Sequence, residues 1–115
     1  MIELTVLNYL KENLTVPVKM EIPIEPPDTF VVLEKTGSSR VDRLNTATFA
    51  AQSYAGTLEE AAKLNEDVKA VIDNMIELDA ISACRLNSDY NFTDQSMKKY
   101  RYQCVYVISY LEVNT

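Results

Sequence analysis

Hydrophobic and polar residues follow two different periods along the first third of the chain. Apolar residues recur every three or four positions from Ile2 to Leu14, which predicts a short helix. From Val16 to Ile24 apolar and polar residues alternate, which predicts a half-buried strand. Its two prolines fall in the polar phase, and because proline cannot donate a ladder hydrogen bond, an edge position is expected. Residues 30–35 are apolar on both faces and predict a second, more central strand.

The clearest single element is a helix over residues 57–75. Thr57 and Glu60 form a capping box, in which Thr57 is the N-cap and Glu60 reaches back towards it. Acidic residues crowd the first turn, where the helix dipole stabilises them. Beyond the cap, the apolar face of the helix consists of Ala61, Leu64, Val68, Val71, Ile72 and Met75.

The rest of the pattern predicts three more strands and two loops. The strands are expected at residues 45–54, 80–86 and 100–111, and the loops at residues 36–43 and 87–99. The first loop is expected to be a protruding hairpin loop that is mobile, because it holds a single apolar residue. The order α-β-β-β-α-β-β predicts an α+β fold in one domain over residues 1–115: a single mixed, mainly antiparallel sheet with the long helix packed on one face.

Composition and charge narrow the classes of function. A chain of 115 residues and 13.0 kDa with 47% hydrophobic and 24% charged residues fits one globular domain and not a disordered protein. The net charge of −6 argues against a protein whose main task is binding phosphates. No apolar stretch has the length of a membrane span, and no basic signal region begins the sequence, so a soluble, intracellular protein without membrane contact is expected.

The usual catalytic and metal-binding residue sets are missing from the sequence. It contains no His, which removes His-dependent triads and His-metal sites. Cys84 and Cys104 lie outside any CxxC motif and within strand-like patterns, so buried reduced thiols are expected in preference to a disulfide. Glu59 and Glu60 could be a catalytic pair, but the capping box explains Glu60 and neighbouring helical residues point in different directions. We therefore predict a protein that is not an enzyme and needs no metal or cofactor.

Two polar clusters are candidates for binding nucleic acid or phosphate. Ser38 and Ser39 follow Gly37 as in a phosphate-binding turn, but the spacing of a phosphate loop is absent and a flexible loop tip is the better interpretation. Residues 98–102, Lys-Lys-Tyr-Arg-Tyr, are the best nucleic-acid candidate. The alternative is that the lysines only solubilise a loop and Arg101 protects the start of a strand.

A stripe of tyrosines lies on one face of the last predicted strand, at Tyr100, Tyr102, Tyr106 and Tyr110. Tyrosine favours half-buried positions and is enriched at protein interfaces. The same pattern fits a sheet core beneath a helix with hydroxyls reaching its rim. Core and interface both stay open for these side chains.

Several strings of residues resemble the small tail terminator, or tail completion, proteins of long-tailed bacteriophages and prophages. In that family a hydrophobic strand ends in a Thr-Gly turn and an irregular loop, followed by an Ala-x-Gln-x-Tyr/Trp-Ala strand and a helix with an internal Ala pair. The matching strings here are residues 29–37, Asp42-Arg43, residues 47–55, residues 57–62 and residues 100–103. The loop here has Gly37-Ser38 where many relatives carry two glycines, which would stiffen it slightly.

The resemblance implies an assembly role. Such proteins form rings, usually hexamers, that cap the tail tube, end its polymerisation and present a surface to the head–tail connector protein. DNA would pass through the channel without tight binding, and the protein would belong to the virion tail after assembly in the bacterial cytoplasm. A closed ring needs two different patches that meet on neighbouring subunits, and the apolar edge at residues 16–24 and the last strand are candidates for them. The predicted interface residues are Ser38, Ser39, Arg40, Asp42, Arg43, Tyr102, Tyr106 and Tyr110.

Two other functions are compatible with the sequence. A head–tail connector or head completion protein would differ in its partner, which would be the portal or its adaptor instead of the tail tube protein. A host α+β protein-binding module would have no virion role, and neighbouring genes would separate it from both.

Overall fold

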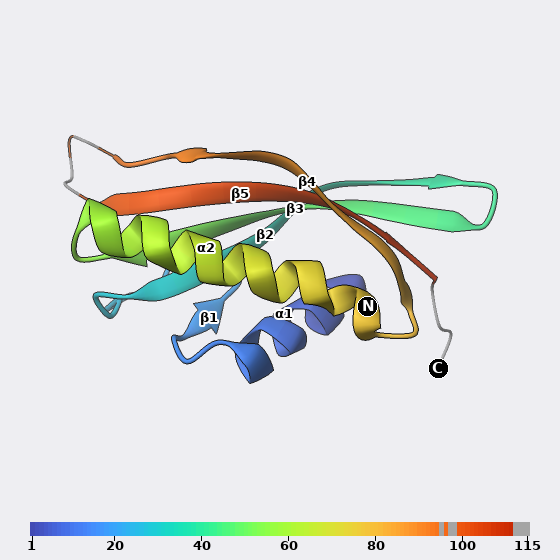
Figure 1. Ribbon diagram of the computed structural model, residues 1–115, viewed down its shortest axis with the longest axis horizontal. Helices are drawn as coiled ribbons and strands as arrows, with labels where there is room; N and C mark the ends of the chain where they lie inside the picture. The colour runs from blue at the N-terminus through green and yellow to red at the C-terminus, as the bar shows by residue number, and fades with distance from the viewer. Residues whose placement is uncertain (95, 97–98, 112–115) are drawn as a thin grey trace.

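The computed structural model describes residues 1–94, 96 and 99–111, which form one five-stranded sheet and two α-helices (Figure 1). The elements are α1 (Ile2–Asn13), β1 (Val18–Lys19), β2 (Phe30–Val41), β3 (Leu44–Ala55), α2 (Leu58–Asn74), the 3₁₀ turn η1 (Met75–Glu77), β4 (Ile81–Asn91) and β5 (Tyr100–Tyr110). In the sheet they lie in the order β1-β2-β3-β5-β4. Only the β1–β2 pair is parallel among the described strands. The predicted α+β fold, its element order and its mainly antiparallel sheet are confirmed.

Both helices cover the same face of the sheet, with α2 running along it and α1 beside α2 (Figure 1). Thr57 is the N-cap of α2, as predicted, because its hydroxyl accepts a hydrogen bond from the Glu60 N–H at 3.1 Å. The other half of the predicted capping box, a return bond to the Glu60 carboxylate, is not formed among the described residues. Neither described helix has the length and apolar composition that crossing a membrane requires. The core between the layers includes Val6, Leu10, Val31, Leu33, Ala47, Phe49, Ala51, Val68, Ile72, Cys104, Tyr106 and Ile108.

The predicted strand at residues 16–24 is largely wrong. Only Val18 and Lys19 pair with β2, and the chain then bends away from the sheet. Four prolines between residues 17 and 27 explain the short pairing, because each lacks the N–H that a ladder needs. The alternating apolar side chains that follow are left on the surface: Met20 is 43% exposed, Ile22 48% and Ile24 101%.

The predicted loop at residues 36–43 is also wrong, although the hairpin does protrude (Figure 1). β2 continues to Val41 and β3 begins at Leu44, so the turn consists of Asp42 and Arg43 alone. Asp42 adopts a left-handed backbone with φ 58°, a conformation that Asp tolerates better than most residues. The ladder with β3 satisfies the backbone whatever the side chains are, so a polar sequence without an apolar period still forms strands here.

β4 is longer than the sequence predicts. It continues to Asn91, five residues into the loop expected at 87–99, and pairs with β5 across two register shifts. The polar residues of β4 pair with β5, and some also contact α2. A polar sequence does not reveal such long-range contacts. Residues 95, 97 and 98 of that predicted loop lie outside the described residues.

Candidate interaction surfaces

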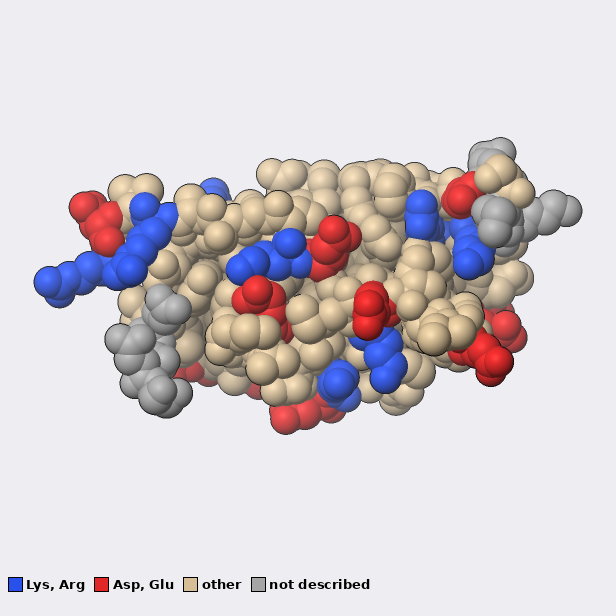
Figure 2. Space-filling model, turned by 180° about the vertical axis from the view of Figure 1, so that it is seen from behind, with Lys and Arg blue, Asp and Glu red and all other residues tan. Residues whose placement is uncertain are grey.

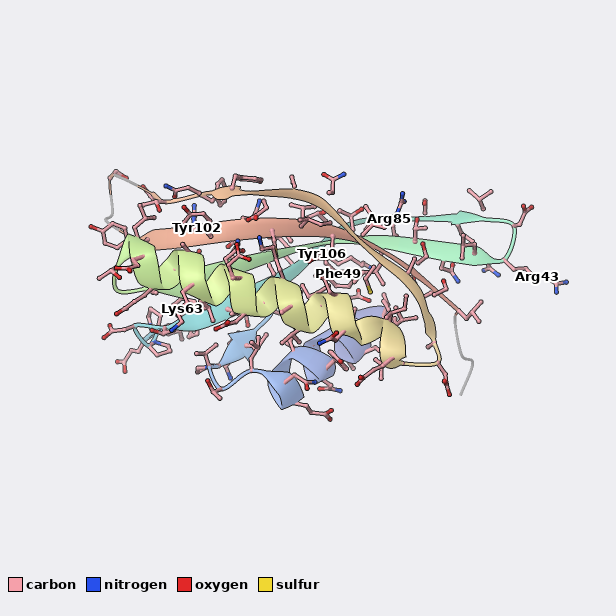
Figure 3. All side chains as sticks on the ribbon, in the orientation of Figure 1. Arg43, Phe49, Lys63, Arg85, Tyr102 and Tyr106 are labelled. Atoms are coloured by element: carbon pink, nitrogen blue, oxygen red, sulfur yellow. The ribbon has the colours of Figure 1, made fainter. Side chains whose placement is uncertain are left out.

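The hairpin tip, which we define as residues 40–44, carries the predicted site residues Arg40, Asp42 and Arg43. All three are exposed, and Figure 3 shows Arg43 extending from the end of the molecule. Val41 and Leu44 flank the turn and are 69% and 45% exposed. Neither arginine forms an ion pair with a residue that the structure describes. The tip therefore presents two cations and two apolar side chains that the subunit itself does not use.

Ser38 and Ser39 do not form a phosphate-binding turn. Both lie within β2, where they pair with Ala47 and Thr46 of β3. The Ser39 and Thr46 hydroxyl oxygens are 2.5 Å apart, so this serine is engaged across the hairpin. A regular ladder holds successive N–H groups in alternating directions and not around an anion. The two serines instead form the polar surface behind the tip.

The tyrosines of β5 divide between core and surface. Tyr106 is 1% exposed and lies between the sheet and α2, beside Phe49 (Figure 3). Its hydroxyl is 2.8 Å from a carboxylate oxygen of Asp73, and burial together with this carboxylate raises the pKa of Tyr106. Tyr106 is thus a core residue and not part of an interface in this subunit. Tyr102 and Tyr110 are half-buried, and their role in an interface stays a prediction.

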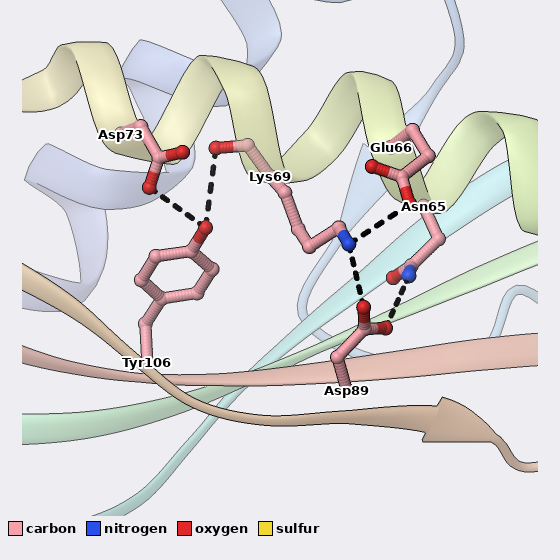
Figure 4. Close-up of polar contacts among 6 residues, drawn as sticks. All are labelled: Asn65, Glu66, Lys69, Asp73, Asp89 and Tyr106. Carbon is pink, nitrogen blue, oxygen red and sulfur yellow. Dashed lines mark hydrogen bonds and ion pairs between the residues drawn. The ribbon is translucent and has the colours of Figure 1, made fainter.

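A polar network that the sequence did not reveal fastens α2 to β4 (Figure 4). Asp89 of β4 accepts hydrogen bonds from the Asn65 amide at 2.6 Å and from the Lys69 ammonium at 2.5 Å. Lys69 also contacts Glu66 at 2.9 Å. Burial alone would raise the pKa of Asp89, but these two donors lower it, and the two carboxylates raise the pKa of Lys69. The available sequence signal was Asn65, a polar residue within the apolar stripe of the helix.

The opposite face of the sheet carries an aromatic cluster near the start of β2. Phe30 and Tyr54 stack with ring centroids 4.5 Å apart, and both are buried. The Arg101 guanidinium lies 4.3 Å from the Phe92 ring centroid and donates to the Tyr54 hydroxyl at 2.8 Å. The Arg101 guanidinium is therefore already bonded within the subunit. It is not available to bind nucleic acid as part of the predicted basic cluster at residues 98–102. Lys98 of that cluster lies outside the described residues.

The two cysteines are free thiols. Cys104 is fully buried, as predicted, whereas Cys84 is half-buried. Burial raises the pKa of Cys84 to about 11 and that of Cys104 to about 12, so that both stay protonated near neutral pH. Neither is suited to act as a nucleophile. Among the described residues, no three metal-ligating side chains come together as a candidate metal site.

Comparison with known proteins gives no match: no protein-family model matches the chain, and no curated protein is significantly similar to it. The geometry itself therefore defines what this chain can do. Among the described residues, the side chains at the hairpin tip are exposed and form no ion pair within the subunit.

Proposed function

We propose that the chain is a non-enzymatic tail assembly protein of a bacteriophage or prophage. In this role it forms an oligomeric ring, of which six copies is the expected number, that caps the tail tube, ends its polymerisation and joins the tail to the head connector. The resemblance of its strand and helix strings to tail terminator proteins supports this assignment. The observation that carries it is the hairpin, which extends the sheet beyond the helix layer and ends in unpaired charged and apolar side chains (Figure 1).

A ring imposes a requirement that the shape of this subunit meets. Head-to-tail contacts need two different surfaces on each subunit, placed so that one copy reaches the next. The subunit is elongated, with extents of 44 × 24 × 23 Å, and its hairpin tip lies at one end of the long axis (Figure 1). An ordered two-stranded projection of this kind can reach a neighbour without distorting the core.

The charge of the subunit is compatible with DNA passage. A net charge of −6 gives a ring little attraction for the phosphate backbone, so DNA could move through its channel without being held. The partners in this proposal are other copies of the chain, the tail tube protein and the head–tail connector protein. The site of action is the virion tail, reached by assembly in the bacterial cytoplasm.

Native mass spectrometry of the chain, alone and mixed with purified tail tube protein, tests the proposal. A closed oligomer that also binds the end of tail tubes is the expected result. The double variant Arg40→Ala with Arg43→Ala should remain folded but lose assembly or tail completion. Lys11→Ala with Lys63→Ala removes the same charge from the helix layer and serves as the matched control.

Two results would contradict the proposal. A chain that stays monomeric with and without the tube protein is not a tail terminator. Association with portal or adaptor rings and not with tail tubes would assign the chain to the head side of the junction instead.

A further inference from the structure

A second exposed apolar segment lies at the other end of the molecule from the hairpin tip. We call residues 20–28, Met-Glu-Ile-Pro-Ile-Glu-Pro-Pro-Asp, the acidic segment, because it holds three carboxylates and no basic residue. Its apolar side chains include Ile22, 48% exposed, and Ile24, 101% exposed. Exposed apolar side chains that lie close together can form a surface for another protein to cover.

The sequence of this segment fits a contact that the isolated subunit does not make. Apolar and polar residues alternate through Ile24, yet pairing with β2 ends at Lys19. Places where a clear local pattern is not used by the fold are often functional sites. The sequence here offers apolar and acidic side chains close together to a partner.

The hairpin tip has the complementary chemistry. Arg40 and Arg43 oppose a single carboxylate at the tip, and Val41 and Leu44 provide its apolar surface. Figure 2, which views the molecule from behind, shows basic side chains projecting at the hairpin end. Basic and apolar groups at the tip therefore match acidic and apolar groups on the segment.

The tip and the acidic segment cannot meet within one chain. The segment ends two residues before β2 begins, and the tip includes the last residue of β2. A strand of 12 residues spans about 40 Å, so the two surfaces lie near opposite ends of the long axis (Figure 1). Only another copy can bring them together.

We propose that the hairpin tip of one subunit docks on the acidic segment of the next copy, head to tail. The inference rests on the proposed ring and names the surfaces that close it. Arg40 and Arg43 face the carboxylates of the neighbouring segment, while Val41 and Leu44 cover its isoleucines. Because each copy offers one tip and one segment, the same contact can join successive copies head to tail into a closed ring. Partly exposed ion pairs at each junction make assembly weaker at high salt.

A charge-exchange experiment tests this docking. The tip variant combines Arg40→Glu with Arg43→Glu, and the segment variant combines Glu21→Lys with Glu25→Lys. Each variant alone places like charges at every junction, so each should need at least about tenfold higher concentration to assemble. An equal mixture should assemble again, because the reversed tip of one variant matches the reversed segment of the other. Native mass spectrometry should then show the two variants in equal numbers.

Controls keep folding separate from assembly. All four substituted residues are exposed, so thermal unfolding of each variant should match the wild-type chain. Lys11→Glu with Lys63→Glu, and Glu12→Lys with Asp79→Lys, make equal changes of charge elsewhere on the surface and should leave assembly intact.

The outcomes separate this inference from the proposed function. Normal rings from either variant alone would overturn the docking while leaving the ring and the tail role standing. A mixture that fails to assemble would also overturn it, as would a wild-type chain that stops at a closed dimer. A wild-type chain that stays monomeric even with tail tube protein would instead contradict the proposed function, and the docking with it.

Discussion

The two ends of the β2–β3 hairpin have the same backbone pairing but opposite surroundings. Near its base, Phe30 to Leu33 are all buried, and α2 and the aromatic cluster cover the two faces of the sheet. Towards the tip, every residue of β2 from Thr36 to Val41 is exposed. The ladder orders both ends, whereas side-chain burial stabilises only the base. The comparison shows that this molecule separates the residues that hold the fold from those available to a partner.

β3 explains how the exposed end stays ordered. It lies between β2 and β5 and pairs with β5 along its length, from Asn45 opposite Tyr110 to Ala55 opposite Tyr100. Immediately behind the tip, β3 is thus held on both edges, whereas β2 there pairs, among the described strands, with β3 alone. Backbone hydrogen exchange should therefore be faster in the outer half of β2 than in β3 at the same level.

The largest expected effect on stability is in the buried part of the hairpin, where Phe49→Ala should lower the free energy of unfolding by about 3–5 kcal/mol. Phe49 is 2% exposed and fills the space beneath α2. Thr48→Ala, on the opposite face of the same strand, is the control and should cost less than about 1 kcal/mol. Urea titration measures both values. Equal losses from the two variants would show that the core does not lie where the structure places it.

Asp89→Asn should lower the free energy of unfolding by about 1–2 kcal/mol near neutral pH, because it removes the charge that pairs with Lys69 and leaves one acceptor oxygen where the carboxylate has two. The pKa of Asp89 is lower in the folded chain than its usual 3.8, so its stabilisation is complete above that pH. It is lost as the pH falls through the lowered value. The difference between wild type and variant should therefore shrink as the pH falls through this value, as urea titrations at several pH values will reveal. A difference that grew on acidification would contradict the assigned ion pair.

At the turn, Asp42→Val should cost about 1 kcal/mol, because a β-branched residue is strained at φ 58°. Asp42→Gly should change the free energy of unfolding by less than about 0.5 kcal/mol, since glycine adopts this backbone without strain. Thermal unfolding of the two variants provides the measurement. If both behave alike, the turn does not have the conformation described.

The smallest expected change in stability is at the tip. Arg40→Ala with Arg43→Ala should alter the free energy of unfolding by less than about 0.5 kcal/mol, because neither side chain has an ionic partner in the described part of the subunit. The same variant is expected to weaken assembly, so the two measurements should diverge. A loss of several kcal/mol in chemical denaturation would mean that the tip belongs to the folding core and would remove the contrast between the hairpin ends.

The sequence correctly predicted those elements in which the apolar side chains are the buried ones. The helix at residues 57–75 carries a cap and an apolar stripe, and both are real in α2. The sequence-based prediction failed where the backbone pairing did not match the polarity of the side chains. The outer half of β2 is polar yet paired, while residues 20–24 are apolar yet unpaired. The outer half of β2 is ordered by backbone hydrogen bonds to β3, the next segment of the chain, and such bonds require no apolar pattern in the sequence.

The candidate site was predictable to a similar extent. Arg40 and Arg43 were identified because charged residues around a turn are exposed in almost any fold, and the structure places them at the hairpin tip. Asp89 was missed because its role depends on Asn65 and Lys69, which reach it only after α2 has packed over β4. The alternation of apolar and polar residues from Val16 to Ile24 was visible in the sequence and predicted a strand. The prolines end the pairing at Lys19, so the later apolar side chains lie on the surface instead.

The strand order also has a consequence for synthesis. β5 is the last of the described strands in the chain, yet it lies between β3 and β4, and β4 pairs with no other described strand. While the protein is being made, β4 leaves the ribosome before the strand that will hold it. The sheet can therefore close only after β5 has been made, when this strand inserts between β3 and β4. Such long-range closure is slow compared with local folding, so the nascent chain passes through a stage in which its unpaired edges need protection from other chains.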